Sequence, residues 1–293
     1  MARQSINLVD HHFTHDETCV AGVASECVQW ERYNRDPGRP TVLTHEDMYR
    51  YDYRHIPEGS RFGLLLESQS VIPRVYSRVR EVIPNYRLVF THSEELLSSF
   101  PNTRWIPGGG IWVGGTYAGG SIGLSDKTRM VSMLTSNKLQ TPLHRRRYLW
   151  AMRLERGTQV DVFRQRWRDG ETISVFDTLR DYRYSIVVEN FIDERYLTEK
   201  VLNCFATGTV PIYLGARQLH QYFNPDGFLT FRNWDDLSKR VLPRLSEHDY
   251  ATRLPAINEN LARSLQFRSI EDYMFRRYLA TELPAPTEGP FEL

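Results

Sequence analysis

The chain has 293 residues, enough for about two domains with cores of their own, and its 37 basic and 36 acidic residues leave a net charge of +1. This balance excludes the broad positive field of a nucleic-acid-binding protein, so we expect no nucleic-acid partner. Three cysteines without metal-like spacing predict a reducing compartment, the cytoplasm, and no apolar run approaches the roughly 20 residues of a transmembrane span, while a peripheral membrane contact stays open.

Short apolar strands alternate with helices over the first hundred residues. Strands are predicted at 6–9, 41–43, 61–66 and 87–90, and helices at 75–82 and 94–100. Ser93 is suited to cap the second helix. The alternation predicts a first Rossmann-like α/β domain.

A polar cluster follows the first predicted strand and consists of Asp10, His11, His12, His15 and Asp16. These residue types are metal ligands, but their spacing matches no metal-binding motif. Loops after a first strand are commonly polar. The sequence therefore favours a solvated or hydrogen-bonded loop over a metal site.

Glu67 stands where the apolar run 62–66 ends, so a carboxylate is predicted at the end of a strand. One interpretation is an acid that precedes a helix before Pro73. The other is a functional carboxylate at the edge of a cleft. His92 occupies the same kind of position after the strand 87–90, where a polar loop histidine is common.

A glycine-rich tract spans residues 108–123, GGGIWVGGTYAGGSIG. It lacks the Lys-Ser/Thr ending of a phosphate-binding P-loop. We therefore expect a mobile connection between two domains. Trp112 and Tyr117 either stack on a sugar or anchor this connection on a core, which is the commoner role of an aromatic side chain.

The second domain is predicted to start with strand 129–134, a polar loop and helix 143–153. Arg145, Arg146 and Arg147 lie near the start of this helix, and arginine suits a phosphate because its guanidinium binds in a bidentate manner. The apolar positions of the helix favour Arg147, whereas the spacing from Asn137 leaves Arg145 open. Further elements are a strand at 160–163, helices at 174–183, 234–245 and 255–279, and a disordered tail at 284–293.

Residues 184–216 predict a strand, a loop, a helix and a second strand. The run Tyr184–Val188 is apolar and β-branched, and polar groups begin at Glu189 and Asn190. Thr198 is suited to cap a helix that ends at Gly208. A right-handed βαβ unit places the carboxyl ends of both strands at one cleft.

Lys200 does not fit the first turn of this helix. A cation there opposes the helix dipole, at a cost of roughly 0.3–1 kcal/mol. An anion such as a diphosphate at the helix start removes the conflict, because it meets free backbone N–H groups and the ammonium together. The alternative is a lysine paired with a nearby Glu or Asp.

The pattern E-N-x(5)-Y-[IL]-T-E-K, followed by an apolar helix and G-T-V-P-I-x-L-G, resembles the donor-binding region of the α1,3/4-fucosyltransferases, glycosyltransferase family 10. It runs here from Glu189 to Gly215. The string LLLESQS around Glu67 is similar to a shorter segment of the same family. The resemblance is close from about 130 to 231 and thin before that.

The resemblance implies a set of site residues. Asn190 and Tyr196 are expected to contact the donor phosphates or sugar, and Glu199 the ribose hydroxyls or sugar. Lys200 with Arg145 or Arg147 is expected to neutralise the diphosphate. Glu67 is expected to act as the catalytic base.

The resemblance also implies the GT-B architecture, two Rossmann-like domains facing across a cleft. We expect an acceptor-side domain at 1–122 and a nucleotide-sugar-binding domain at 123–283. The implied activity is an inverting, metal-independent transfer of a sugar, most simply fucose from GDP-fucose, to a glycan hydroxyl, with no cofactor. Alternatives are another donor such as UDP-xylose, or a non-catalytic nucleotide- or carbohydrate-binding protein.

Overall fold

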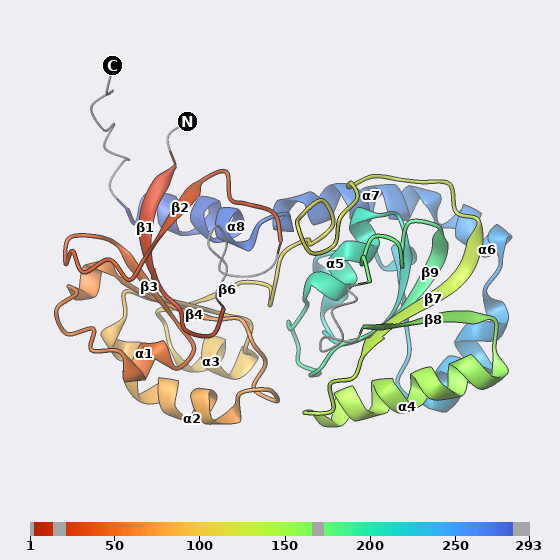
Figure 1. The fold of residues 1–293 in the computed structure, drawn as a ribbon, viewed down its shortest axis with the longest axis horizontal. Helices are drawn as coiled ribbons and strands as arrows, with labels where there is room; N and C mark the ends of the chain where they lie inside the picture. The colour runs from red at the N-terminus through yellow and green to blue at the C-terminus, as the bar shows by residue number, and fades with distance from the viewer. Residues whose placement is uncertain (1–2, 14–21, 166–172, 284–293) are drawn as a thin grey trace, which may run out of the picture. The chain divides into compact units, whose positions relative to one another are not determined.

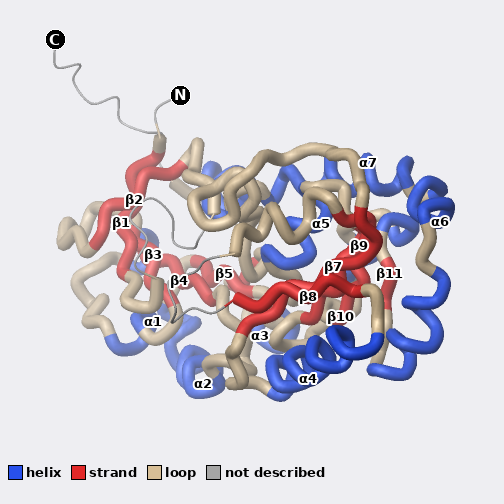
Figure 2. Tube along the Cα trace, turned by 45° about the vertical axis from the view of Figure 1, so that its right-hand side comes forward, coloured by secondary structure: helices blue, strands red, loops and turns tan. Residues whose placement is uncertain are grey.

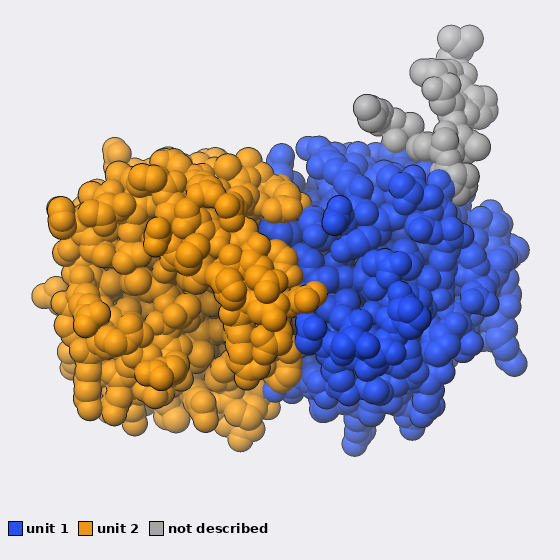
Figure 3. Space-filling view, turned by 180° about the vertical axis from the view of Figure 1, so that it is seen from behind, with its two compact units in different colours: residues 1–110, 267–293 blue, residues 111–266 orange. Residues whose placement is uncertain are grey.

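The computed structural model describes residues 3–13, 22–165 and 173–283. The chain forms two compact units, which Figure 3 shows in separate colours. Unit 1 consists of Met1–Gly110 and Phe267–Leu293, and unit 2 of Ile111–Gln266. No helix in the described ranges is both long and apolar enough to cross a bilayer.

Unit 1 is built on a six-stranded parallel sheet in the order β2-β1-β3-β4-β5-β6 (Figure 1). The strands are β1 (Gln4–Val9), β2 (Val28–Arg32), β3 (Thr41–Thr44), β4 (Arg61–Leu65), β5 (Leu88–Thr91) and β6 (Thr103–Trp105). The helices are α1 (Asp47–Arg50), α2 (Pro73–Val82), α3 (Glu94–Ser99) and α8 (Ile270–Arg277). The four strands expected in this half are confirmed, whereas β2 and β6 were not predicted.

Strand alternation gives the unit 1 sheet two apolar faces. Ile6, Leu8, Phe62 and Leu64 form one cluster with Ile270 and Met274 of α8. Figure 2 traces the strands of this sheet in red, with α1 and α2 beneath them. The intervening strand residues meet α1, α2 and α3 in a second cluster. Because α8 supplies part of the first cluster, the end of the chain belongs to unit 1.

Unit 2 has a five-stranded parallel sheet in the order β11-β10-β9-β7-β8. The strands are β7 (Arg129–Ser136), β8 (Val160–Gln165), β9 (Tyr182–Val188), β10 (Val210–Leu214) and β11 (Leu229–Thr230). The helices are α4 (Pro142–Gly157), α5 (Glu199–Ala206), α6 (Glu247–Thr252) and α7 (Leu254–Ser264). Trp150 and Leu154 of α4 pack with β-strand residues and Ile257 of α7 in one core.

The division of the chain differs from the predicted boundary between residues 122 and 123. From Ile111 on, the glycine-rich tract already belongs to unit 2. The Asn203 side-chain oxygen accepts hydrogen bonds from the backbone N–H groups of Trp112, at 2.8 Å, and Val113, at 3.1 Å. Gly123 N–H donates to the Ala206 carbonyl at 2.9 Å. The tract is thus packed on α5, and the predicted tail 284–293 lies outside the described residues.

Three predicted helices are corrected by the structure. Residues 175–181 form turns closed by hydrogen bonds such as Leu179 N–H to the Phe176 carbonyl, at 3.0 Å, and β9 begins at Tyr182. The segment 234–245 contains a π-helix at Asp236–Val241 and a 3-10 turn around Pro243. The segment 255–279 is divided into α7 and α8, one in each unit.

A capping box starts α4. The Thr141 hydroxyl accepts a hydrogen bond from His144 N–H at 3.1 Å, and His144 Nδ1 accepts one from Thr141 N–H at 3.3 Å. The His144 residue is 5% exposed. Burial, reinforced by the nearby cations Arg147, Lys200 and Lys138, lowers the pKa of His144 to about 4.

This pKa makes the stability of the fold depend on pH. Below the ordinary histidine pKa of about 6.5 the unfolded chain binds a proton that the folded chain accepts only near pH 4, so stability falls as the pH falls. We expect His144 to lower the free energy of unfolding by about 2 kcal/mol between pH 7 and pH 5. His144→Gln keeps an acceptor in the capping box and cannot titrate, so urea unfolding should show a smaller loss. His220→Gln, at an exposed position, should keep the full loss, and equal losses in the two variants would contradict the assignment.

Candidate active site

The carboxyl ends of β9 and β10 meet a buried carboxylate at the start of α5. Glu189, which follows β9, is fully buried, and the Thr198 hydroxyl lies 2.8 Å from its Oε1 and 2.9 Å from its Oε2. The Tyr213 hydroxyl lies 3.4 Å from Oε1. Burial raises the pKa of Glu189, and the Lys200 ammonium opposes that rise. Glu189 therefore ties β9, β10 and the α5 cap together.

Lys200 is held between two carboxylates. Its Nζ donates to Glu199 Oε1 at 2.8 Å and to the Thr198 hydroxyl at 3.1 Å, and it lies 3.3 Å from Glu189 Oε2. Burial favours a lower pKa for Lys200, but Glu189 and Glu199 together raise it above its ordinary value. The alternative of a lysine paired with nearby acids is thus the arrangement in the structure. The side chain remains 28% exposed, so a further anion can reach it.

The structure separates the two arginine candidates of α4. Arg147 is 6% exposed and donates to the Val188 carbonyl at 3.1 Å and to the Ser136 hydroxyl at 3.4 Å. Its Nε has no hydrogen-bond partner among the described residues. Burial lowers its pKa, while Glu189 and Glu199 raise it. Arg145 is exposed and faces away from this edge of the sheet, since the helix places it about 200° from Arg147.

Two further predicted residues line the same edge. Asn190 is 8% exposed, and its Oδ1 lacks a hydrogen-bond partner within the part of the chain that the structure describes. Tyr196 is buried, and its carbonyl lies 3.4 Å from the Tyr213 hydroxyl. Asn190 Oδ1 is thus a buried acceptor at the carboxyl end of β9, the same strand whose Val188 carbonyl accepts from Arg147.

Gly215 explains why the motif ends in glycine. A Cβ at this position would lie 2.3 Å from the Tyr213 hydroxyl and 2.5 Å from Glu189 Cγ. Any larger residue would displace the two side chains that surround the buried carboxylate. The small residue in the sequence pattern is therefore a packing requirement of the site.

Glu67 lies in unit 1, just beyond the end of β4. Its backbone is fixed on both sides: Glu67 N–H donates to His45 Nε2 at 3.1 Å, and its carbonyl accepts from the Tyr76 hydroxyl at 2.8 Å. His92 Nε2 lies 3.3 Å from the same carbonyl. Among the described residues, the Glu67 carboxylate makes no hydrogen bond or ion pair. The loop thus holds the backbone and leaves the acid available.

His45, which the sequence pattern did not single out, supports the backbone of Glu67. It is fully buried, and its Nε2 also accepts from Leu66 N–H at 3.2 Å. Burial, with smaller effects of His12 and His92, lowers its pKa well below the ordinary value, so the ring is neutral and can accept both bonds. The only local signal is its position after a strand, shared with Glu67 and His92.

The polar cluster after β1 forms a hydrogen-bonded loop. Asp10 Oδ1 accepts from the backbone N–H groups of His12 and Phe13 and from the Thr44 hydroxyl, at 2.7 to 3.0 Å. His15 and Asp16 lie outside the described residues. Across the ranges 3–13, 22–165 and 173–283, no group of three or more His, Cys, Asp or Glu side chains is arranged to hold a metal ion.

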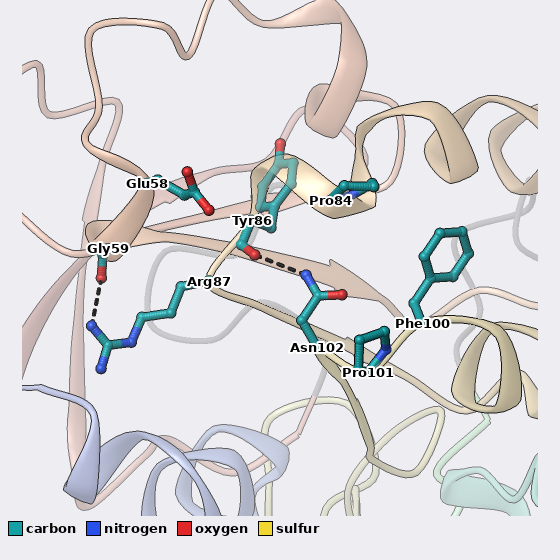
Figure 4. A pocket seen from close by; sticks show the side chains of 8 residues that line it. All are labelled: Glu58, Gly59, Pro84, Tyr86, Arg87, Phe100, Pro101 and Asn102. Atoms are coloured by element: carbon teal, nitrogen blue, oxygen red, sulfur yellow. Dashed lines mark hydrogen bonds between the residues drawn. The ribbon is translucent and has the colours of Figure 1, made fainter.

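A hollow of about 530 Å³ opens at the opposite edge of the unit 1 sheet, before β5 and β6 (Figure 4). Its polar walls are engaged within the protein. Arg87 donates to the Gly59 carbonyl at 3.4 Å and pairs with Glu282, and Asn102 donates to the Tyr86 carbonyl at 2.8 Å. None of the predicted site residues lines it.

Two similarities to known proteins indicate a protein family. The family model described as glycosyltransferase family 10 (fucosyltransferase) C-term matches residues 124–251. An α-(1,3)-fucosyltransferase from Helicobacter pylori is 33% identical over 61 residues, which are 20% of this chain and 13% of that protein. Both similarities agree with the resemblance of residues 189–215 to the family 10 fucosyltransferases.

Similarity to solved structures indicates the fold. A crystal structure of an α1,3-fucosyltransferase with GDP-fucose aligns with 97% of this chain and 91% of its own, at 12% identity and a TM-score of 0.50. A sucrose-phosphate synthase from Thermosynechococcus elongatus aligns with 95% of this chain and 100% of its own, at 11% identity and a TM-score of 0.53. Residues 124–251 therefore match the C-terminal domain of the family 10 glycosyltransferases, within a chain that has the two Rossmann-like domains of the GT-B fold.

Proposed function

We propose that this chain is an inverting, metal-independent glycosyltransferase that moves fucose from GDP-fucose to a hydroxyl group of a glycan. The observation that carries the proposal is the cationic and amide cluster at the carboxyl edge of the unit 2 sheet, inside the segment that matches the fucosyltransferase family model. The solved fucosyltransferase with GDP-fucose has the same fold, which supports this choice of donor.

The donor diphosphate is assigned to Arg147 and Lys200, and a hydroxyl of the donor sugar to Asn190. Arg147 Nε is a buried N–H donor without a partner among the described residues, and Lys200 is partly exposed beside the first turn of α5. Asn190 Oδ1 is a buried acceptor without such a partner, which suits a hydroxyl group. A diphosphate there takes the Lys200 ammonium from Glu199 and thereby frees that carboxylate to accept hydrogen bonds from ribose or sugar hydroxyls. Tyr196 completes the donor side of the site.

The leaving group develops negative charge as the bond from the anomeric carbon to the diphosphate oxygen breaks. The sequence contains no D-x-D triplet of the kind that holds a divalent ion in other glycosyltransferases. Arg147 and Lys200 supply two positive groups that are already oriented, and electrostatic stabilisation of this kind acts without rearrangement during the reaction. Metal independence is proposed on these grounds.

Glu67 is assigned as the general base. The acceptor hydroxyl oxygen forms its bond to the anomeric carbon from the face opposite the diphosphate, its proton moves to the Glu67 carboxylate, and the electron pair of the broken bond leaves with the diphosphate. Attack from the opposite face inverts the anomeric configuration. The fixed backbone of Glu67 and its unengaged carboxylate support this role.

The donor and the metal requirement are tested together. Each of GDP-fucose, UDP-xylose and UDP-glucose is offered to the unmodified chain, and release of the nucleoside diphosphate is followed with and without an oligosaccharide mixture. We expect turnover with GDP-fucose alone, unchanged in EDTA. Turnover that is lost in EDTA and restored by Mn²⁺ would refute metal independence. Turnover with a UDP sugar only would show that this sugar, and not GDP-fucose, is the donor.

Glu67→Gln should bind GDP normally and lose transfer by about 10²–10⁴-fold, which is the usual contribution of general-base catalysis. The change keeps the shape of the side chain and removes its basicity. Glu81→Gln, at an exposed position of α2, is the matched control and should transfer sugar at the rate of the unmodified chain. A transfer rate that is not reduced in Glu67→Gln would show that Glu67 is not the general base.

Arg147→Lys and Arg145→Lys form a second matched pair on one helix. Lysine keeps the charge but loses the forked geometry. We expect Arg147→Lys to weaken GDP binding about tenfold, or about 1.4 kcal/mol, and Arg145→Lys to leave it unchanged. Calorimetry with GDP measures both, and a thermal melt of each variant verifies folding. The reverse order of effects would assign the diphosphate to Arg145.

A further inference from the structure

Two residues with left-handed backbone bracket the loop that follows β1. Tyr33 (φ 56°) and His45 (φ 46°) are the non-glycine residues with positive φ in the described ranges. Such conformations are strained for residues with a Cβ, and they gather at functional sites where the surrounding structure enforces them. Both residues contact the segment Asp10–Phe13, so the strain of unit 1 is concentrated on one loop.

The contacts fix this loop on both sides. The Tyr33 hydroxyl donates to the Asp10 carbonyl at 2.7 Å, and its ring centroid lies 4.9 Å from that of His11. The His45 ring lies 4.7 Å from the His12 ring and 5.5 Å from the Phe13 ring. His45 also accepts the hydrogen bond from Glu67 N–H. The loop and the assigned base therefore share one buried support.

His11 is presented to solvent by a buried acid. Asp47 Oδ1 lies 2.7 Å from His11 Nδ1, and Oδ2 accepts from His11 N–H at 2.9 Å. The Asp47 side chain is 7% exposed, whereas that of His11 is 61% exposed. Both carboxylate oxygens thus serve one residue, and Nδ1 carries the proton that faces Asp47. Nε2 is left as an oriented acceptor toward solvent.

An oriented imidazole nitrogen beside an exposed aromatic ring suits a sugar. Pyranose hydroxyls donate to an acceptor such as Nε2, and the C–H face of the ring packs on an aromatic side chain. Tyr33 is 40% exposed, and its hydroxyl bond fixes the ring beside His11. Neither residue belongs to the apolar clusters of unit 1, and both lie beyond the ends of β1 and β2.

We propose that His11, oriented by Asp47, and Tyr33 form the subsite that binds the acceptor sugar. The subsite lies at the carboxyl edge of the unit 1 sheet, where Glu67 also lies, and it recognises a pyranose through one hydroxyl and one ring face. The inference rests on the proposed transferase function. His11 acts here as a positioning residue, and Glu67 remains the base.

The test compares two amide variants of His11. His11→Asn keeps a donor toward Asp47 and removes the group at Nε2, whereas His11→Gln places an amide near the position of Nε2. The free disaccharide that the unmodified chain glycosylates fastest in a panel is the probe. His11→Asn should raise its KM about tenfold or more, with a smaller change in kcat. His11→Gln should recover part of that loss. The Kd for GDP should stay that of the unmodified chain.

His55→Asn is the matched control. His55 is also an exposed histidine of unit 1 beside a tyrosine, Tyr51, with ring centroids 6.1 Å apart. It precedes β4, and no buried carboxylate among the described residues bonds to it. Its KM for the disaccharide should be unchanged. A His11→Asn variant with unchanged KM, in a chain that transfers fucose, would overturn the subsite alone. A chain that releases no nucleoside diphosphate from any donor would overturn the proposed function and the subsite with it.

Discussion

The polar edge of unit 2 depends on one buried ion pair. The Glu189 carboxylate lies under the Thr198 cap and beside the Lys200 ammonium, which fixes the start of α5 relative to β9 and β10. Removing one partner of such a pair typically costs about 3–5 kcal/mol, because the other charge stays buried. The Glu189 pair therefore orients Lys200 whether or not a ligand is present.

This arrangement changes the explanation of the lysine in the first turn of α5. In the sequence, Lys200 is a cation that opposes the helix dipole, and a diphosphate bound at the helix start is one way to compensate its charge. In the structure two carboxylates already compensate it. Under the proposed function, an incoming diphosphate competes with Glu199 for the ammonium, so that binding exchanges partners and frees Glu199 to contact the donor. Arg147, which touches no carboxylate in the described contacts, has no such exchange to make.

Unit 1 prepares its edge differently. Its acid, Glu67, is fixed through the backbone by a neutral histidine and a tyrosine, and its carboxylate remains uncommitted. Strained backbone at Tyr33 and His45 supports the neighbouring loop. A carboxylate without partners is free to meet a hydroxyl, whereas the cations of unit 2 are held in place before any ligand arrives. The two edges thus suit proton acceptance and phosphate recognition, respectively.

The sequence alone determined the elements that depend on local pattern. Short apolar runs predicted four of the six parallel strands of unit 1 and the central strands of unit 2, but not β2 or β6. Thr198 and Gly208 predicted the ends of α5, because caps are set by neighbours within a few residues. The motif from Glu189 to Gly215 predicted the family. Tertiary structure alone decided which acids and bases meet. Arg147 was separated from Arg145 by the face of α4 that packs on β9, the end of the chain joined unit 1 through α8, and Asp47 met His11 across 36 residues. Such pairings join residues far apart in the chain, and no local pattern contains them.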